Sequence, residues 1–107
     1  MPTYLYQAAY TSQSWANQVK KPADRLKAVG EMIKASGGKL VASYYAFGKH
    51  DVVLIAEMPD NSAAATFAIA AAAGGALTHL RTTPLMTSAE GLKAIRAAGK
   101  SAYKPPA

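Results

Sequence analysis

An alanine-rich block in the second half of the chain limits the possible folds more than any other feature. Eight of the eleven residues 63–73 are alanine, the residue with the highest helix propensity. Pro59-Asp60-Asn61-Ser62 precedes the block with a strand-breaking residue and polar caps, and Gly74-Gly75 ends it. Even if extended to Leu77, the segment is shorter and less apolar than the roughly twenty residues of a membrane-spanning helix. The block therefore predicts a soluble helix.

A strand and a helix are predicted before this block. Residues 3–11 are rich in aromatic residues and lack Gly and Pro, which is typical of a strand. We expect three side chains of one parity to face the helices as core: Tyr4, Tyr6 and Tyr10. Residues 12–21 are polar and ambiguous. A helix then starts at Pro22-Ala23-Asp24 and ends at Gly37-Gly38. Its apolar stripe, at offsets of three and four, is formed by Leu26, Val29 and Ile33.

Two strands are predicted between the helices, and a strand and a helix after them. Residues 39–47 and 50–58 are β-rich and are separated by Gly48-Lys49, the spacing of a tight hairpin. Residues 77–85 form a weaker strand, and Ser88 opens a short helix. The order is β-α-β-β-α-β with an added C-terminal helix. This α+β order predicts the ferredoxin-like arrangement, in which helices cover one face of a four-stranded antiparallel sheet.

The size and charge of the chain favour one small, self-associating domain. With 107 residues the core is small, so burying a further face against a second copy would stabilise the fold. The predicted domain covers residues 1–98, and residues 99–107 form a flexible basic tail. Three of the six units of net positive charge lie after residue 88, so the basicity indicates a solubilising tail and does not demand a nucleic-acid partner. The sequence lacks a signal-like start, and we expect a cytoplasmic protein.

Several short motifs follow one another over roughly residues 2–90. They are Pro2-Thr3-Tyr4, Pro22-Ala23-Asp24-Arg25-Leu26, Gly37-Gly38, Asp51-Val52-Val53 with Glu57, Pro59-Asp60 before Ala63-Ala64-Ala65, and Arg81-Thr82-Thr83. A turn, Gly48-Lys49-His50-Asp51, leads into the fourth of them. Together these motifs resemble the GYD-domain family of small bacterial and archaeal proteins, whose eponymous Gly-x-Tyr-Asp turn has tyrosine where this chain has His50. The resemblance implies a ferredoxin-like subunit that pairs sheet to sheet, as in dimeric α/β barrels. The family's activity is largely unassigned, and it supplies no catalytic residues.

Polar residues of one strand parity are candidates for a ligand site in the dimer. Alternation is expected to place them on the sheet face away from the helices, with Asp51, Phe47 and Thr83 on the same parity. The candidate ligand-binding residues are Gln7, Ser43, Tyr45, Glu57, His79 and Arg81. With the first and third predicted strands central, Gln7 can neighbour both Glu57 and Arg81. A structural ion pair between Arg81 and Glu57 that holds the dimer face together is favoured over a ligand site.

The same residues argue against several kinds of chemistry. His50 and Asp51 are adjacent in a strand and face opposite sides, so they do not form a catalytic pair. The chain has two histidines and no cysteine, and its carboxylates lack a recognisable ligand spacing, so we expect no metal. Dinucleotide, P-loop and serine-hydrolase motifs are absent from the sequence, and we expect no cofactor. Whether the protein is an enzyme stays open.

Two classes of function remain. The first is a homodimer, or a higher assembly of dimers, that binds a small molecule between its sheets; a cofactor-free enzyme of the dimeric α/β-barrel type and a ligand-free assembly or regulatory subunit are the alternatives. Its interface would contain Val41, Val53 and Ile55. The second is RNA binding, because RNA-recognition modules share the element order. The third predicted strand ends in Asp51 and Glu57 and has no aromatic residue, which argues against RNA.

Overall fold

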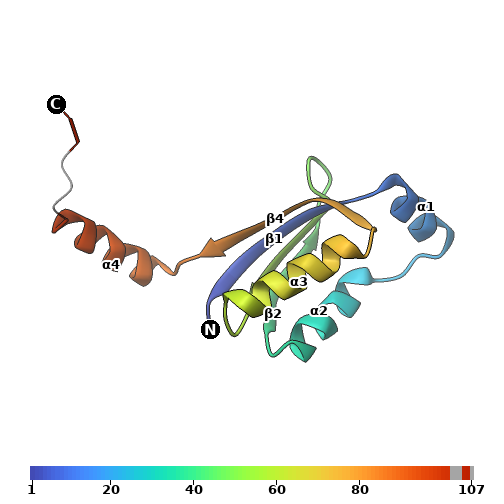
Figure 1. Ribbon diagram of the computed structural model, residues 1–107. Coiled ribbons are helices and arrows are strands. Elements are labelled where there is room, and N and C mark those ends of the chain that lie inside the picture. Colours follow the sequence, from blue (N-terminus) through green and yellow to red (C-terminus); the bar gives the residue numbers. More distant parts are fainter. Residues whose placement is uncertain (102–104, 107) are drawn as a thin grey trace.

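A computed structural model describes residues 1–101 and 105–106 of the chain. The described part contains a strand, two helices, a hairpin, a helix, a strand and a helix, in the order drawn in Figure 1. Their bounds are β1 Thr3–Tyr10, α1 Ser12–Lys20, α2 Arg25–Ala35, β2 Lys39–Tyr45, β3 Val52–Glu57, α3 Asn61–Ala73, β4 Leu77–Leu85 and α4 Ser88–Gly99. The α+β fold with a four-stranded sheet is confirmed.

The sheet is antiparallel throughout and has the order β2-β3-β1-β4, so β1 and β3 are central as predicted. Helices α2 and α3 lie on one face of it (Figure 1). We call the opposite face the open face. The arrangement follows from the strand pattern, because alternate residues of β1 and β3 are buried and the residues between them are only half-buried.

The core fills the space between the sheet and the two helices. Tyr4 and Tyr6 of β1 are buried in it, and Tyr10 packs against its edge, as their shared parity predicts. The ring of Tyr6 meets Phe67 of α3 edge to face, with ring centroids 5.0 Å apart. On the α2 side the core is closed by Leu26 and Ile33.

Polar caps and glycines set the helix bounds. Asp24 caps α2 by accepting a hydrogen bond from the backbone N–H of Leu26 at 3.1 Å, and Asp60 caps α3 through the N–H of Ala63 at 2.8 Å. Gly37 ends α2 with a positive φ of 85°, a backbone conformation that favours glycine. Gly38 passes so close to β3 that a Cβ atom there would lie 2.6 Å from the carbonyl oxygen of Glu57.

Two local features differ from the sequence expectation. The ambiguous residues 12–21 form α1, whose N-cap Thr11 accepts a hydrogen bond from the N–H of Ser14. Ser14 and Gln18 are buried and bond to each other, so a polar pattern hid this helix. The predicted two-residue hairpin turn is instead a longer loop, closed by a 2.8 Å hydrogen bond from the N–H of Ala46 to the carbonyl of Asp51.

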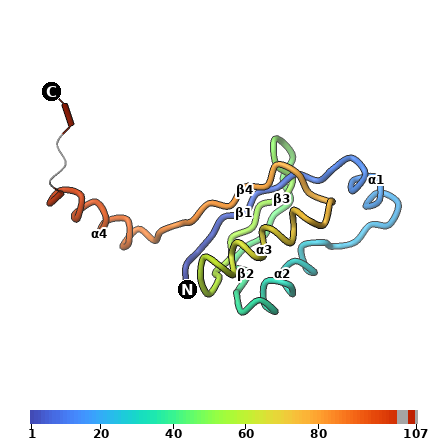
Figure 2. Tube along the Cα trace, in the orientation of Figure 1, coloured from blue at the N-terminus to red at the C-terminus, as the bar shows by residue number. Residues whose placement is uncertain are grey.

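Helix α4 stands apart from the rest of the molecule. Figure 2 shows the chain leaving β4 and running into α4 at the end of the sheet where the N-terminus lies. None of its residues is buried. The predicted tail, residues 99–107, includes residues 102–104 and 107, which lie outside the described part. Within the described residues, no helix is long and apolar enough to cross a membrane.

Candidate functional site

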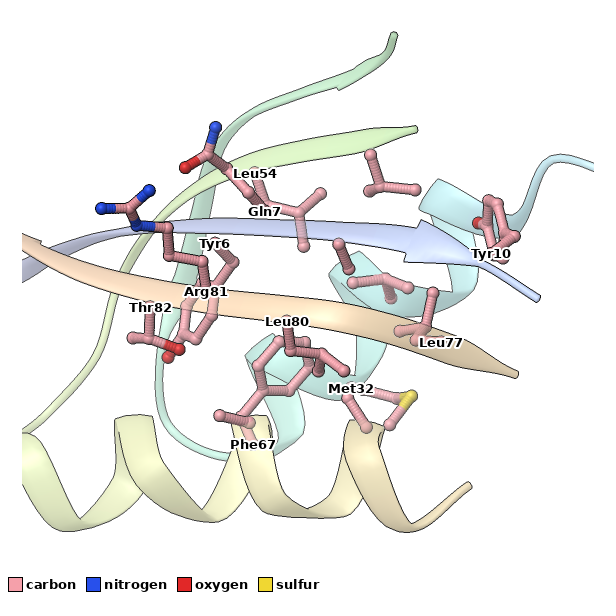
Figure 3. A pocket seen from close by; sticks show the side chains of 15 residues that line it. Tyr6, Gln7, Tyr10, Met32, Leu54, Phe67, Leu77, Leu80, Arg81 and Thr82 are labelled. Atoms are coloured by element: carbon pink, nitrogen blue, oxygen red, sulfur yellow. The ribbon is translucent and has the colours of Figure 1, made fainter. Parts of the chain in front are cut away.

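The polar cluster expected on the open face is only partly assembled in one subunit. Gln7 and Arg81 are cross-strand partners on β1 and β4, and Figure 3 shows both side chains on the same side of these strands. Glu57 pairs with Thr3 on β1 and with Lys39 on β2. The neighbour of Gln7 on β3 is Val53, so the expectation that Gln7 neighbours Glu57 is wrong. Glu57 lies about 13 Å further along the strands.

Ser43 and Tyr45 lie on the helix side of the sheet, which corrects the predicted parity of β2. A β-bulge between Leu40 and Ala42 shifts the register of this strand against β3. Ser43 therefore pairs with the buried Leu54 and Tyr45 with the buried Val52. The Tyr45 hydroxyl also accepts a hydrogen bond from the N–H of Arg25 at the start of α2. Tyr44 takes the open-face position instead, opposite Val53.

His79 sits in a second bulge, in β4. The register between β1 and β4 shifts around this residue, which has a positive φ of 51° and an exposed side chain. This places His79 outside the regular pairs that hold Arg81 and Thr83 on the open face. A role for His79, or for the other candidate residues, in ligand binding stays a prediction.

Asp51, the last residue of the Gly-x-Tyr-Asp-like turn, has a structural role. Its carboxylate accepts a hydrogen bond from the N–H of Tyr10 at 2.9 Å, and its own N–H donates to the carbonyl of Ala8 at 2.8 Å. Asp51 thus fixes the hairpin loop to the end of β1. His50 beside it is half-buried.

The open face combines this polar pair with apolar side chains. Leu5, Val53 and Ile55 are half-buried at its centre, and Tyr44, opposite Val53, is exposed toward the β2 edge. Val41 is exposed and lies in the β2 bulge, outside the regular pairs. The apolar character expected for Val53 and Ile55 is therefore present on this face of the single subunit.

A cavity of about 170 Å³ lies on the other side of the sheet, between the strands and helices α2 and α3. Figure 3 shows its lining: Tyr6 and Leu80 from the strands face Phe67 of α3 and Met32 of α2. In the same view the side chains of Gln7 and Arg81 point away from the cavity. The remaining wall is almost wholly apolar and includes Val29, Val52, Leu54, Ala68, Ala71 and Leu77.

The cavity exists because the sheet-facing side of α3 is built mainly from alanine. Positions spaced by three and four residues along a helix share one side, and here they are Ala64, Phe67, Ala68 and Ala71. Only Phe67 is large, so the helix leaves space where longer side chains would reach the sheet. This spacing was available in the sequence, but the alanine block was interpreted only as a signal for a helix.

The cavity offers hydrophobic contact and little else. Tyr6 lines the cavity, and its hydroxyl already donates a 3.0 Å hydrogen bond to the carbonyl of Ala64. Burial, with a smaller contribution from the nearby Tyr4, raises the pKa of Tyr6 to about 12. This phenol therefore stays neutral at physiological pH. Among the described residues, no group of three His, Asp or Glu side chains is placed to hold a metal ion.

The fold and the cavity define a class: α+β proteins in which an antiparallel sheet, with helices on one face, encloses an apolar pocket. The GYD domain family model matches residues 4–95 of the 107-residue chain. The chain belongs to the GYD domain family. No curated protein and no solved structure matches it.

Proposed function

We propose that the protein binds a small, neutral, apolar molecule in the cavity between its sheet and helices α2 and α3. The cavity itself is the observation that carries this proposal. Protein interiors are close-packed, and voids much larger than a water molecule are few. If it stays empty and dry, an apolar space of about 170 Å³ forgoes packing contacts worth up to about 4 kcal/mol, at the roughly 24 cal/mol per Å³ that applies to closed cavities. That cost is a large fraction of the 5–15 kcal/mol that typically stabilises a domain.

The size and lining of the cavity indicate the class of ligand. An engineered apolar cavity of about 150 Å³ in another protein stays dry and binds benzene. A space of about 170 Å³ therefore suits a single aromatic ring or a short aliphatic chain. Tyr6 and Phe67 contribute aromatic rings to the lining, and Met32 adds a polarisable thioether. Met32 is 50% exposed, which provides an entry point at the surface.

Binding is favoured over cofactor-free catalysis. A catalyst in this cavity would need a group whose pKa lies near the working pH. The described lining contains no His, Asp, Glu or Lys, and Tyr6, with a pKa of about 12, stays protonated near neutral pH and cannot act as a base there. The Arg81 guanidinium is directed away from the cavity (Figure 3).

We propose further that the protein is a homodimer that packs its open faces together. Leu5, Val53 and Ile55 gain from burial there, at about 25 cal/mol per Å² of apolar surface removed from water. The face also carries opposite charges on the two sides of β1, Glu57 on β3 and Arg81 on β4. A two-fold related copy can place Arg81 against Glu57, so this face is complementary to itself.

The ligand proposal is tested by filling the cavity from α3. Ala68→Leu places a larger side chain in the cavity, and Ala65→Leu makes the same change at an exposed position of the same helix. We expect toluene, near its solubility limit, to raise the melting temperature of the wild type and of Ala65→Leu by several degrees. In Ala68→Leu the shift should disappear, while the unliganded variant gains about 0.5–2 kcal/mol from the filled void. Equal toluene shifts in both variants would show that the ligand binds elsewhere.

A further inference from the structure

Helix α4 has an apolar side that no other described part of the chain buries. Leu92 and Ile95 share one side of the helix, and Ile95 is 70% exposed. Thr87 and Glu90 form a capping box at its start, in which each side chain bonds to the other residue's backbone. The local sequence therefore specifies this helix, although none of its residues is buried.

The position of α4 gives the molecule an extended shape. The radius of gyration is 17.3 Å, whereas a compact domain of this length has about 13 Å. A 12-residue helix is marginal in water without tertiary contacts. Within the described chain, α4 therefore lacks the tertiary packing that a helix of this length needs.

An apolar groove lies at the other end of the molecule. It is formed between α1 and the β2–β3 loop, and its exposed apolar walls are Trp15, Val19, Tyr45 and Phe47. Phe47 is 100% exposed, and the ring of Trp15 is held in place by an edge-to-face contact with Tyr10. We call this hollow the α1 groove.

The two unpartnered features cannot meet within one subunit. Helix α4 follows the end of β4 that pairs with the start of β1, and α1 follows the opposite end of β1 (Figures 1 and 2). The two open faces can pack about a two-fold axis that lies between the sheets, parallel to their planes, and runs perpendicular to the strands. The α4 end of each copy then lies beside the α1 end of the other. In such a dimer both α4 helices and both α1 grooves gain an apolar partner.

The area available on the open face supports this exchange. Four strands about 4.8 Å apart and about 26 Å long cover about 500 Å². A standard interface buries about 800 Å² on each partner. Helix α4 is about 18 Å long and about 10 Å wide, so docking it on the second copy buries about 180 Å² of the helix. The second copy's α4 buries a similar area of the first copy's α1 groove. Counted as flat area, the sheet face alone falls below this figure, and the exchanged helices add the remaining area.

We infer that in the homodimer each α4 packs its Leu92 and Ile95 side into the α1 groove of the second copy. This inference rests on the proposed homodimer. It assigns the docking partner of α4 and makes the C-terminal helix a part of the neighbouring subunit's surface.

A cross-linking experiment on the full chain tests the exchange, because the chain has no cysteine of its own. The variant Val19→Cys with Ile95→Cys should form a covalent dimer on mild oxidation. The control variant, Val19→Cys with Ala94→Cys, moves the second thiol by one residue, away from the side of α4 that carries Leu92 and Ile95. We expect at least five-fold more covalent dimer in the first variant, measured by non-reducing electrophoresis. Equal yields, or an intramolecular disulfide in a monomer, would overturn the exchange.

A second measurement does not depend on disulfide formation. Ile95→Asp should raise the dimer dissociation constant at least ten-fold in sedimentation equilibrium, whereas Ala94→Asp, with the same added charge, should leave it nearly unchanged. A dimer that neither substitution weakens would show that the sheets pair without the helices. A monomeric wild type would refute both the exchange and the dimer, and toluene binding in that monomer would leave the cavity proposal standing.

Discussion

At the scale of single residues, the side chains of the turn motif and of β1 serve the fold. Asp51 links the hairpin loop to β1 through both its carboxylate and its backbone N–H. Tyr6 spans the core from β1 to α3, where its hydroxyl reaches the carbonyl of Ala64. Because that hydroxyl is neutral and already bonded, Tyr6 shapes the cavity without supplying a proton-transfer group.

The raised pKa of Tyr6 predicts a loss of stability at high pH. The folded-state pKa is about 12 and the ordinary value is 10.0, so the unfolded chain loses this proton first. The stabilisation is complete below pH 10 and declines as the pH rises from 10 to 12. Urea unfolding at several pH values should show this decline in the wild type and a smaller one in Tyr6→Phe. Burial also raises the pKa of Tyr10, which accounts for a remaining slope. An unchanged slope in Tyr6→Phe would contradict the assignment.

The residue scale is also where prediction from sequence succeeded least. Strand parity placed Gln7 and Arg81 on one face correctly, because no bulge separates them from their regular pairs. Strand parity failed for Ser43 and Tyr45, because one extra residue between Leu40 and Ala42 moves the following side chains of β2 to the opposite face of the sheet. A bulge costs little and leaves no clear mark in the sequence, so neither this one nor the one at His79 could be foreseen.

At the scale of elements, short local sequence signals determine the bounds of most helices and strands. The caps Asp24 and Asp60, the glycine stops and the aromatic strand residues mark α2, α3 and β1 close to their observed bounds. Helix α1 escaped prediction because its buried side is polar, with Ser14 and Gln18 bonded to each other. The cavity was not predicted from the sequence, because its presence depends on the distance between α3 and the sheet, which is set by tertiary packing.

The close approach of Gly38, in the turn between α2 and β2, to the end of β3 gives a prediction at this scale. A Cβ at Gly38 would lie 2.6 Å from both the Glu57 carbonyl oxygen and the Met58 Sδ. The backbone of β3 cannot move without disturbing its pairing with β1, so Gly38→Ala should lower the free energy of unfolding by about 1–3 kcal/mol. Gly48→Ala is the matched control, since a Cβ there meets nothing within 4 Å. Equal stabilities of the two variants in urea unfolding would contradict this packing.

At the scale of the whole molecule, the sheet separates two surfaces to which we assign different functions. Its helix side holds the cavity, and its open face holds the apolar and charged residues that we assign to the dimer. The sequence predicted a dimer and a ligand site on the same open face. The apolar cavity that we propose as the ligand site lies on the opposite side of the sheet, so ligand binding and subunit pairing can be tested separately.

The most direct test of the central claim is a methyl-selective NMR titration of the full chain with toluene. If the ligand enters the cavity, the methyl signals of Leu80, Leu54 and Met32 should shift and saturate together, because these side chains line it. The methyl signals of Val53 and Ile55, on the open face, should stay nearly unchanged. Saturating shifts confined to Val53 and Ile55, or no saturable shift in any of these methyl groups, would contradict the assignment of the cavity as the binding site.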